Sequence, residues 1–294
     1  MQNLKPHISY NLPWRGLPGD LPSDIEVFAI GDIHGQADLL ALVLDEIRSI
    51  PRAAHRRHLV FLGDLIDRGP ASIRAVELAM GANQLADADE LHVLPGNHDL
   101  ALLLALEDAN RLGTWSALGG DKVMAELGMS ENTHSWAEIS AKFKEVLNPA
   151  YLHAMTVGAT HLYFGDLLFV HAGVHPDRDR AEFLDIDRRS IEIEYHWASI
   201  RYPFLSYTEG WDMRDQDLER RRRKPTVIIH GHTPAIRQDL LRSEDLIICD
   251  GIEGHRTVAL DIGAAYRPQL AYAHFRNRGG LAEVQISAVK ICSS

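Results

Sequence analysis

The amino-acid sequence predicts an α/β fold whose first part is a parallel sheet with crossover helices. Three short apolar runs in the first hundred residues have the length and composition of buried strands. Between them, leucine, isoleucine and valine recur at the three- and four-residue spacing of amphipathic helices. This alternation of strand and helix is typical of a parallel sheet. The strands are expected at 26–30, 58–62 and 91–94, and the helices at 38–50, 70–80 and 100–107.

The pattern changes after the third helix. The stretch from about 110 to 155 reads as helical with glycine breaks, and it is expected to be an insertion over one face because it is too short for a core of its own. An N-terminal extension (1–24) should precede a single domain (25–294). The last strands are closely spaced, which suggests antiparallel hairpins. The later strands are expected at 162–164, 167–170, 226–230, 246–249, 257–260, 269–275 and 283–289.

Composition excludes several classes of protein. The 294 residues are 46% hydrophobic, enough for a large core, and the formal net charge of −11 argues against a nucleic-acid partner. The two cysteines, Cys249 and Cys292, are too far apart for a CxxC motif, so neither a disulfide framework nor a thiolate metal site is indicated. Neither a signal-peptide pattern nor a membrane-spanning run is seen. We therefore expect a cytoplasmic protein without a membrane partner.

A glycine-flanked polar motif follows each of the first three strands: GDIHG at 31–35, GDLIDRG at 63–69 and GNHD at 96–99. The carboxyl ends of strands in open α/β sheets are where ligands bind. Turn and capping preferences alone explain glycine–aspartate pairs, but they do not require histidine. Carboxylate, amide and imidazole groups together suit a divalent metal. The candidate ligands are Asp32, His34, Asp64 and Asn97, with His171 and His232 after later strands.

The spacing of these residues indicates a hydrolytic centre. Asp64 is expected to bridge two cations, since a carboxylate suits ions roughly 3.5–4 Å apart that lower the pKa of a bridging water. His98 is available to protonate a leaving alkoxide, and Asp67 would stabilise its charged form. The Arg68 guanidinium matches two phosphate oxygens; its alternative role is a surface residue that caps the turn.

Two other features are given no role in the site. His230 lies two residues before His232 and is expected to be buried rather than a metal ligand. The basic run Arg220–Lys224 is interpreted as a solvated helix end, with binding of an acidic substrate as the alternative.

These motifs, with VHAG around His171 and GHTP around His232, resemble the phosphoprotein phosphatase branch, bacterial and serine/threonine protein phosphatase-like, of the calcineurin-like metallophosphoesterases. Segments 115–120, 199–205 and 260–264 extend the similarity. The resemblance implies a sandwich of two mixed β-sheets flanked by helices. It implies a first metal on Asp32, His34 and Asp64, a second on Asp64, Asn97, His171 and His232, a proton-donor pair of His98 and Asp67, and phosphate clamps at Arg68 and Arg201.

The sequence departs from the resembled pattern at two positions. Asp99 stands where protein phosphatases usually carry glutamate, a variant that resembles the symmetrical diadenosine tetraphosphate hydrolases. In those hydrolases, however, the position of Asp67 is usually not acidic, which favours the protein phosphatases. Pro234 stands where a nuclease-like relative would place a further metal histidine, which disfavours a nuclease.

The expected function is hydrolysis of phosphate monoesters by direct attack of a metal-bridging water. The substrate is a phosphorylated protein or a small phosphoester, with serine/threonine protein phosphatase as the leading assignment. Two divalent ions are expected, manganese first, with iron or zinc as alternatives. The rival functions are a symmetrical diadenosine tetraphosphate hydrolase and a catalytically silent scaffold, which the complete ligand set disfavours.

Overall fold

The strands form two mixed sheets in the computed structural model, which describes residues 6–207, 211, 226–234 and 257–292. The larger sheet has the order β1-β11-β10-β3-β4-β5, with β2 beside β11, and the smaller has the order β6-β7-β8-β9. The strands are β1 (His7–Asn11), β2 (Arg15–Gly16), β3 (Ile25–Ile30), β4 (Arg56–Phe61), β5 (Glu90–Val93), β6 (His161–Phe164), β7 (Leu167–Val170), β8 (Val227–His230), β9 (Thr257–Ala259), β10 (Gln269–Arg278) and β11 (Leu281–Ile291).

Strand pairing agrees with most of the sequence prediction. The parallel order β3-β4-β5 and the antiparallel hairpin of β10 with β11 are both present. Strand β9 differs, because it pairs in parallel with β8 in the second sheet. The segment before residue 25 also differs, since it contains β1 and β2, both antiparallel to β11. The strand expected at 246–249 and the basic run at 220–224 lie outside the described residues.

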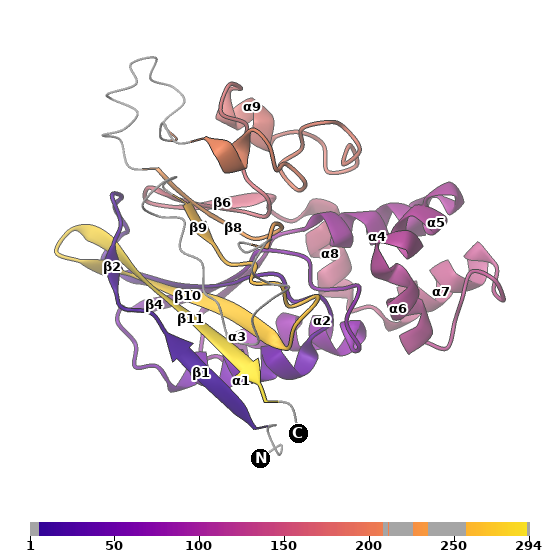
Figure 1. The fold of residues 1–294 in the computed structure, drawn as a ribbon, viewed down its shortest axis with the longest axis horizontal. Helices are drawn as coiled ribbons and strands as arrows, with labels where there is room; N and C mark the ends of the chain where they lie inside the picture. Colours follow the sequence, from indigo (N-terminus) through magenta and orange to yellow (C-terminus); the bar gives the residue numbers. More distant parts are fainter. Residues whose placement is uncertain (1–5, 208–210, 212–225, 235–256, 293–294) are drawn as a thin grey trace.

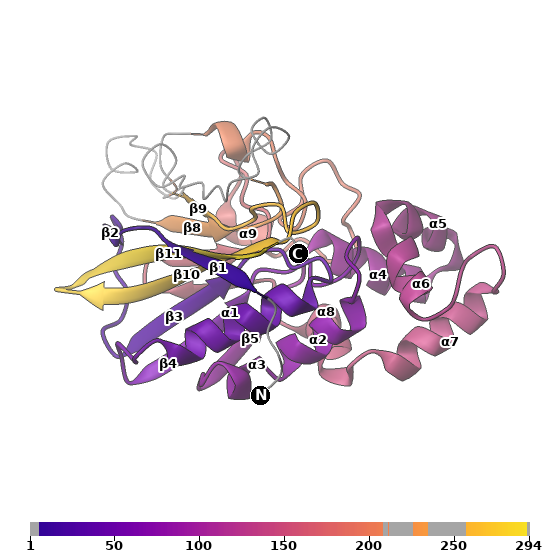
Figure 2. The same ribbon diagram turned by 60° about the horizontal axis from the view of Figure 1, so that its bottom comes forward.

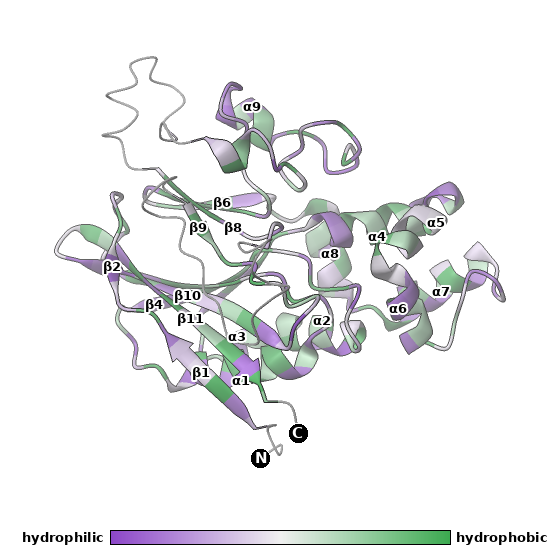
Figure 3. Ribbon diagram, in the orientation of Figure 1, coloured by the Kyte–Doolittle hydropathy of each residue, from purple (hydrophilic) through white to green (hydrophobic). Residues whose placement is uncertain are grey.

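Helices connect the strands of the large sheet and form the region after the third motif. Figure 1 shows α5, α6 and α7 together at one side of the molecule, and Figure 3 shows both hydrophilic and hydrophobic segments along them, as expected of partly exposed helices. The helices are α1 (Ala37–Ser49), α2 (Ser72–Met80), α3 (Ala82–Leu85), α4 (Asn97–Glu107), η1 (Ala109–Arg111), α5 (Leu112–Trp115), η2 (Ser116–Gly120), α6 (Asp121–Glu126), α7 (Trp136–Val146), α8 (Pro149–Val157), α9 (Arg180–Leu184) and η3 (Phe204–Ser206).

The sheets pack face to face, with helices outside the larger one. Strand β3 shows why, since alternate side chains point to opposite faces. Phe28 and Ile30 join the core formed with α1 and α2, while Val27 and Ala29 join the core shared with the second sheet. Figures 1 and 2 both place β8 and β9 on one side of the large sheet and α1 to α3 on the other. The predicted sandwich of two mixed sheets flanked by helices is therefore confirmed.

A buried charged network crosses the large sheet. Glu26 of β3 accepts hydrogen bonds from Arg57 Nε (2.9 Å) and His274 Nε2 (2.7 Å). Arg57 also donates to the carbonyls of Ile47 and Ile50 at the end of α1. The exposed fraction of Glu26 is 0% and that of Arg57 is 1%. These contacts fasten helix α1 to three neighbouring strands.

Twelve short helices are described, and their length bears on membrane association. None of them has the length and apolarity needed to cross a bilayer.

Candidate active site

The candidate ligands gather where five strands end. Asp32 and His34 follow β3, Asp64 follows β4, and Asn97 begins α4 just after β5. His171 and His232 follow β7 and β8 of the second sheet. The site therefore lies at one edge of the sandwich and draws residues from both sheets. Glycines allow this close approach: a Cβ at Gly96 would lie 2.1 Å from Asp64 Oδ1.

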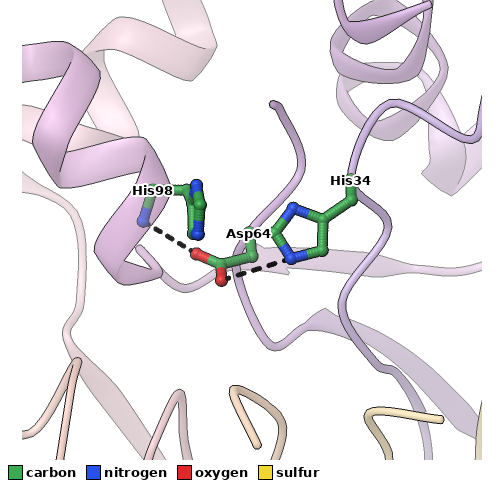
Figure 4. Close-up of side chains that lie close together, drawn as sticks. All are labelled: His34, Asp64 and His98. Carbon is green, nitrogen blue, oxygen red and sulfur yellow. Dashed lines mark hydrogen bonds and ion pairs between the residues drawn. The ribbon is translucent and has the colours of Figure 1, made fainter. Parts of the chain in front are cut away.

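Asp64 lies at the centre of this group. Its Oδ1 accepts a hydrogen bond from the backbone N–H of His98 at 2.9 Å, and its Oδ2 lies 3.7 Å from His34 Nε2. Figure 4 shows the carboxylate between the two histidine side chains. Asp64 Oδ2 also lies 3.4 Å from His171 Nε2. One carboxylate thus faces imidazoles from both sides.

A second group surrounds Asn97. Its Oδ1 lies 2.8 Å from His232 Nδ1 and 3.2 Å from His171 Nε2. His171 Nδ1–H donates to Leu62 O at 2.7 Å, which leaves Nε2 directed at the site. The backbone N–H of His232 donates to both carboxylate oxygens of Asp32 at 3.0 Å. Asp32 is thereby held beside the second sheet.

The donor set fits divalent metal ions. Two groups of side chains each place their ligand atoms within 4.8 Å of one another, His34 with Asp64 and His98, and Asp64 with His171 and His232. Burial lowers the pKa of His34 to about 3, and because Nδ1–H donates to Ile66 O, the unprotonated Nε2 faces the site. Its lone pair accepts a hydrogen bond from Arg68, and a metal ion would take the place of that donor. The two groups share Asp64, in agreement with a bridge.

The electrostatics of the site also favour bound positive charge. Burial, and then the charges of Asp261 and Asp64, raise the pKa of Asp32 well above its ordinary range. Burial opposes protonation of His171, but Asp64 and then Asp32 outweigh it and raise its pKa to about 10. Without metal, a proton at His171 stabilises these carboxylates. Metal ions would supply the same charge.

His98 and Asp67 form a buried pair beside Asp64. The Nδ1–H of His98 donates to Asp67 Oδ2 at 2.7 Å, and the indole N–H of Trp115 donates to the same carboxylate at 3.0 and 3.2 Å. Burial raises the pKa of Asp67, and the hydrogen bond from His98 opposes that rise. Asp67 fixes the His98 ring so that Nε2 remains available for proton transfer.

Asp99 is a structural residue of the site to which the sequence assigned no role. Its carboxylate accepts hydrogen bonds from the backbone N–H of Asp64 (2.7 Å), Leu65 (3.2 Å) and Gly96 (2.9 Å), and from the Tyr151 hydroxyl (2.7 Å). Burial raises its pKa to about 6, with the Asp64 charge adding to the rise. Asp99 therefore ties two motif loops together. In the sequence, the only sign of this role is that an acidic residue directly follows the asparagine–histidine pair.

The two candidate phosphate clamps are placed differently. Arg68 is half-buried and donates from Nη1 to His34 Nε2 at 3.3 Å and from Nε to Leu118 O at 3.3 Å. Its guanidinium also lies 5.7 Å from the Tyr266 ring centre. Arg201 is exposed, and its charge, after burial and His171, helps to lower the pKa of His232. Both arginine side chains thus lie near candidate metal ligands, Arg68 beside His34 and Arg201 near His232.

Two further features border the site. His230 is buried, and its Nδ1 lies 3.1 Å from Gly231 O while its ring packs edge-on against Phe204. It belongs to neither group of ligand atoms. A cavity of about 190 Å³ adjoins Asn97, and its wall is largely apolar. The apolar side chains of that wall are Ala101, Leu104, Leu118 and Ile191.

The chain is similar to named bacterial proteins and to a solved structure. The bis(5'-nucleosyl)-tetraphosphatase PrpE (asymmetrical) of Bacillus subtilis is 23% identical over 253 residues, 84% of this chain and 89% of that protein. The protein of the same name from Oceanobacillus iheyensis is 27% identical over 233 residues, 72% of this chain and 78% of that protein. The solved structure of a mutant cold-active protein tyrosine phosphatase shares the fold, with a TM-score of 0.50 and 18% identity over 90% of this chain and 83% of that chain.

A family model described as calcineurin-like phosphoesterase matches residues 25–246, which include every motif that contributes to the site. The chain therefore belongs to the calcineurin-like phosphoesterases, a family of hydrolases that use divalent metal ions.

Proposed function

We propose that this protein is a two-metal phosphomonoesterase of the serine/threonine protein phosphatase type. The observation that carries the proposal is the buried contact of His98 with Asp67, supported by Trp115. The alkoxide of serine or threonine is a poor leaving group and needs a proton as it departs. A histidine held by a buried carboxylate is suited to supply it.

Each candidate residue has a proposed role. His98 donates the proton from Nε2, and Asp67 stabilises the charged ring. Arg68 binds two phosphate oxygens with its planar fork, and Arg201 contributes a second cation. Asp32, His34 and Asp64 would hold one ion, and Asp64, Asn97, His171 and His232 the other. When bound, two divalent ions, manganese by preference, activate water and offset phosphate charge.

A second candidate function is hydrolysis of dinucleoside tetraphosphates. The names of the relatives from Bacillus subtilis and Oceanobacillus iheyensis favour it. The apolar cavity beside Asn97 would accept part of a substrate beyond its phosphate in either case. A nucleotide phosphate leaves more easily than an alkoxide, so this reaction depends less on the His98 proton.

The deciding experiment compares a phosphoserine/phosphothreonine peptide with diadenosine tetraphosphate, using protein loaded with manganese. We expect a higher kcat/KM for the peptide than for diadenosine tetraphosphate. Preference for the tetraphosphate would reject the leading proposal. Its products would then separate asymmetrical cleavage, which yields ATP and AMP, from symmetrical cleavage, which yields two ADP.

Two controls complete this experiment. The Asp64→Asn variant must lose both activities if they belong to the site and not to a contaminant. Hydrolysis of p-nitrophenyl phosphate tests catalysis without regard to the natural substrate. Absence of turnover with manganese, iron and zinc alike would reject both functions in favour of a silent scaffold.

A further inference from the structure

A second group of metal-ligating side chains lies on the large sheet, apart from the candidate active site. It contains His58 of β4 and Glu90 and His92 of β5, and it shares no residue with the groups around Asp64. His58 and Glu90 are direct partners in the parallel register of the two strands. His92 follows Glu90 by two residues, so all three side chains project from the same face.

The three ligand atoms form a nearly equilateral triangle. His58 Nδ1 lies 3.1 Å from His92 Nε2, and Glu90 Oε2 lies 3.6 Å from His58 Nδ1 and 3.7 Å from His92 Nε2. Tetrahedral zinc with bonds of about 2.0–2.1 Å keeps its nitrogen and oxygen ligands roughly 3.3 Å apart. The spacing of the triangle therefore matches one face of such a coordination shell.

The surroundings orient the ligands and leave one side open. The two imidazole rings stack with their planes 13° apart, and the Phe164 ring of the second sheet packs against both, with centre distances of 4.8 and 5.8 Å. The exposed side-chain fraction rises from 5% for His58 to 23% for His92 and 46% for Glu90. Metal can therefore reach the triangle from solvent, and water can complete the fourth position.

The nearby charges are compatible with a bound cation. Arg56 Nη1 lies 3.7 Å from Glu90 Oε1, whereas the contacts with the two histidines are made by Oε2. The same guanidinium is held at 2.8 Å by Asp24. Glu90 Oε2 thus remains directed at the imidazoles.

We propose that His58, Glu90 and His92 bind one transition-metal ion of the zinc class. Two imidazoles and one carboxylate favour zinc, cobalt or nickel over magnesium or calcium, which prefer oxygen ligands. Strand β5 is at the edge of the large sheet and has four residues. The ion would clamp this short edge strand to β4. This site is independent of the function proposed above.

The test compares zinc stoichiometry and affinity of the wild-type protein with those of His92→Gln and Glu90→Gln. Both side chains are partly exposed, so the variants should fold. We expect each variant to bind one equivalent of zinc fewer per chain than wild type. The metal occupancy of the candidate active site should be the same in all of them. Phosphatase activity with saturating manganese should be unchanged, because neither residue belongs to that site.

His55→Gln is the matched control, since His55 is an exposed histidine three residues before His58. It should keep the full stoichiometry. Wild type and His92→Gln are also loaded with Co²⁺. The absorption spectrum of wild type minus that of His92→Gln should show the bands of tetrahedral cobalt. Equal stoichiometry in wild type and both cluster variants would overturn the proposal and leave only a hydrogen-bonded imidazole pair. An equal loss in His55→Gln would also overturn it, because the binding would then be nonspecific.

Discussion

At the scale of single residues, the backbone conformation sets the site apart. Six non-glycine residues among those described have positive φ, and five of them are His34, Asp64, Asp67, Arg68 and His232. Positive φ is uncommon for residues with a side chain and costs free energy. The hydrogen bonds and packing of the motif loops must compensate for this cost. The strain therefore coincides with the residues to which we assign chemistry.

The role of Asp64 is tested by Asp64→Asn. The amide keeps the size of the side chain but removes the charge that offsets two cations. We expect loss of most activity and of at least one metal ion per chain, measured by elemental analysis alongside turnover. Full metal content with normal turnover would contradict the bridging assignment.

The His98→Asn variant tests the proton donor. It should retain its metal ions while the chemical step slows by roughly 10²–10⁴-fold, the usual contribution of a positioned acid. The loss should be large for a phosphoserine peptide and small for p-nitrophenyl phosphate, whose leaving group departs without a proton. Equal losses in kcat on both substrates would remove His98 from this role.

Arg68→Ala tests phosphate recognition. Removal of a charge-assisted hydrogen-bonding group should cost about 1.5–3 kcal/mol, seen as weaker inhibition by inorganic phosphate and lower kcat/KM. Arg68→Lys should restore part of the loss, since it keeps the charge but not the planar fork. Metal content should stay constant in both. If phosphate inhibition and turnover survive in Arg68→Ala, the residue only caps its turn and Arg201 becomes the leading clamp.

The sequence predicted where the candidate ligands lie better than it predicted the residues that hold them in place. The motifs at 31–35, 63–69 and 96–99 placed the candidate ligands at strand ends, because residue type and strand pattern are both local. Asp99 has four donors, from Asp64, Leu65, Gly96 and Tyr151. Three of those donors are distant in sequence, so the local pattern marks Asp99 as an acidic residue after the asparagine–histidine pair but does not identify its partners.

At the scale of elements, the sequence predicts strands with a regular local pattern and misses the partners of strands that are defined by long-range pairing. Strands β3 to β5 alternate with helices, and that regularity identifies a parallel sheet. Strand β9 has three residues, too few to reveal its neighbour from periodicity. Strand β1 is exposed along its whole length, so it lacks the apolar signal of a buried strand. The positions of β1 and β9 therefore become clear only from the strands with which they pair, β11 and β8.

Among the contacts between elements, the buried Glu26 network should have a large effect on the free energy of unfolding. Glu26→Gln leaves Arg57 buried without its carboxylate, and breaking such a pair costs about 3–5 kcal/mol. Urea unfolding at about pH 7 should show this loss. Asp87→Asn is the control, because it weakens an exposed ion pair with Arg52, and exposed pairs contribute far less to stability than buried ones.

The effect of Glu26 should also depend on pH. Burial alone would raise the pKa of Glu26, but hydrogen bonds from His274, Arg57 and the backbone N–H of Ala53 outweigh it and lower the pKa below 4.5. A depressed pKa contributes stability above the unfolded value and loses it as pH falls through the folded value. The difference in unfolding free energy between wild type and Glu26→Gln should therefore shrink below about pH 4.5. A constant difference would show that Glu26 acts through packing alone.

At the scale of the whole molecule, metal binding and folding should be linked. Five buried aspartates, Asp32, Asp64, Asp67, Asp99 and Asp261, share the site, and burial together with the Asp64 charge raises the pKa of the other four. Ions that bind only the folded state add about 2.7 kcal/mol at a hundred times their Kd. At about 2–4 °C per kcal/mol, chelation should lower Tm by roughly 5–10 °C, measured by calorimetry with and without added manganese. An unchanged Tm would indicate that the site holds no ion under those conditions.

The contact between Trp115 and Asp67 has an optical consequence. The indole N–H that donates to Asp67 belongs to α5, in the helical region between the third motif and β6. Tryptophan fluorescence responds to charge near the ring, so the contribution of Trp115 to the emission of the five tryptophans should change with the charge of the carboxylate that orients His98. The protein thus carries an intrinsic spectroscopic probe two hydrogen bonds away from the proposed proton donor's free nitrogen.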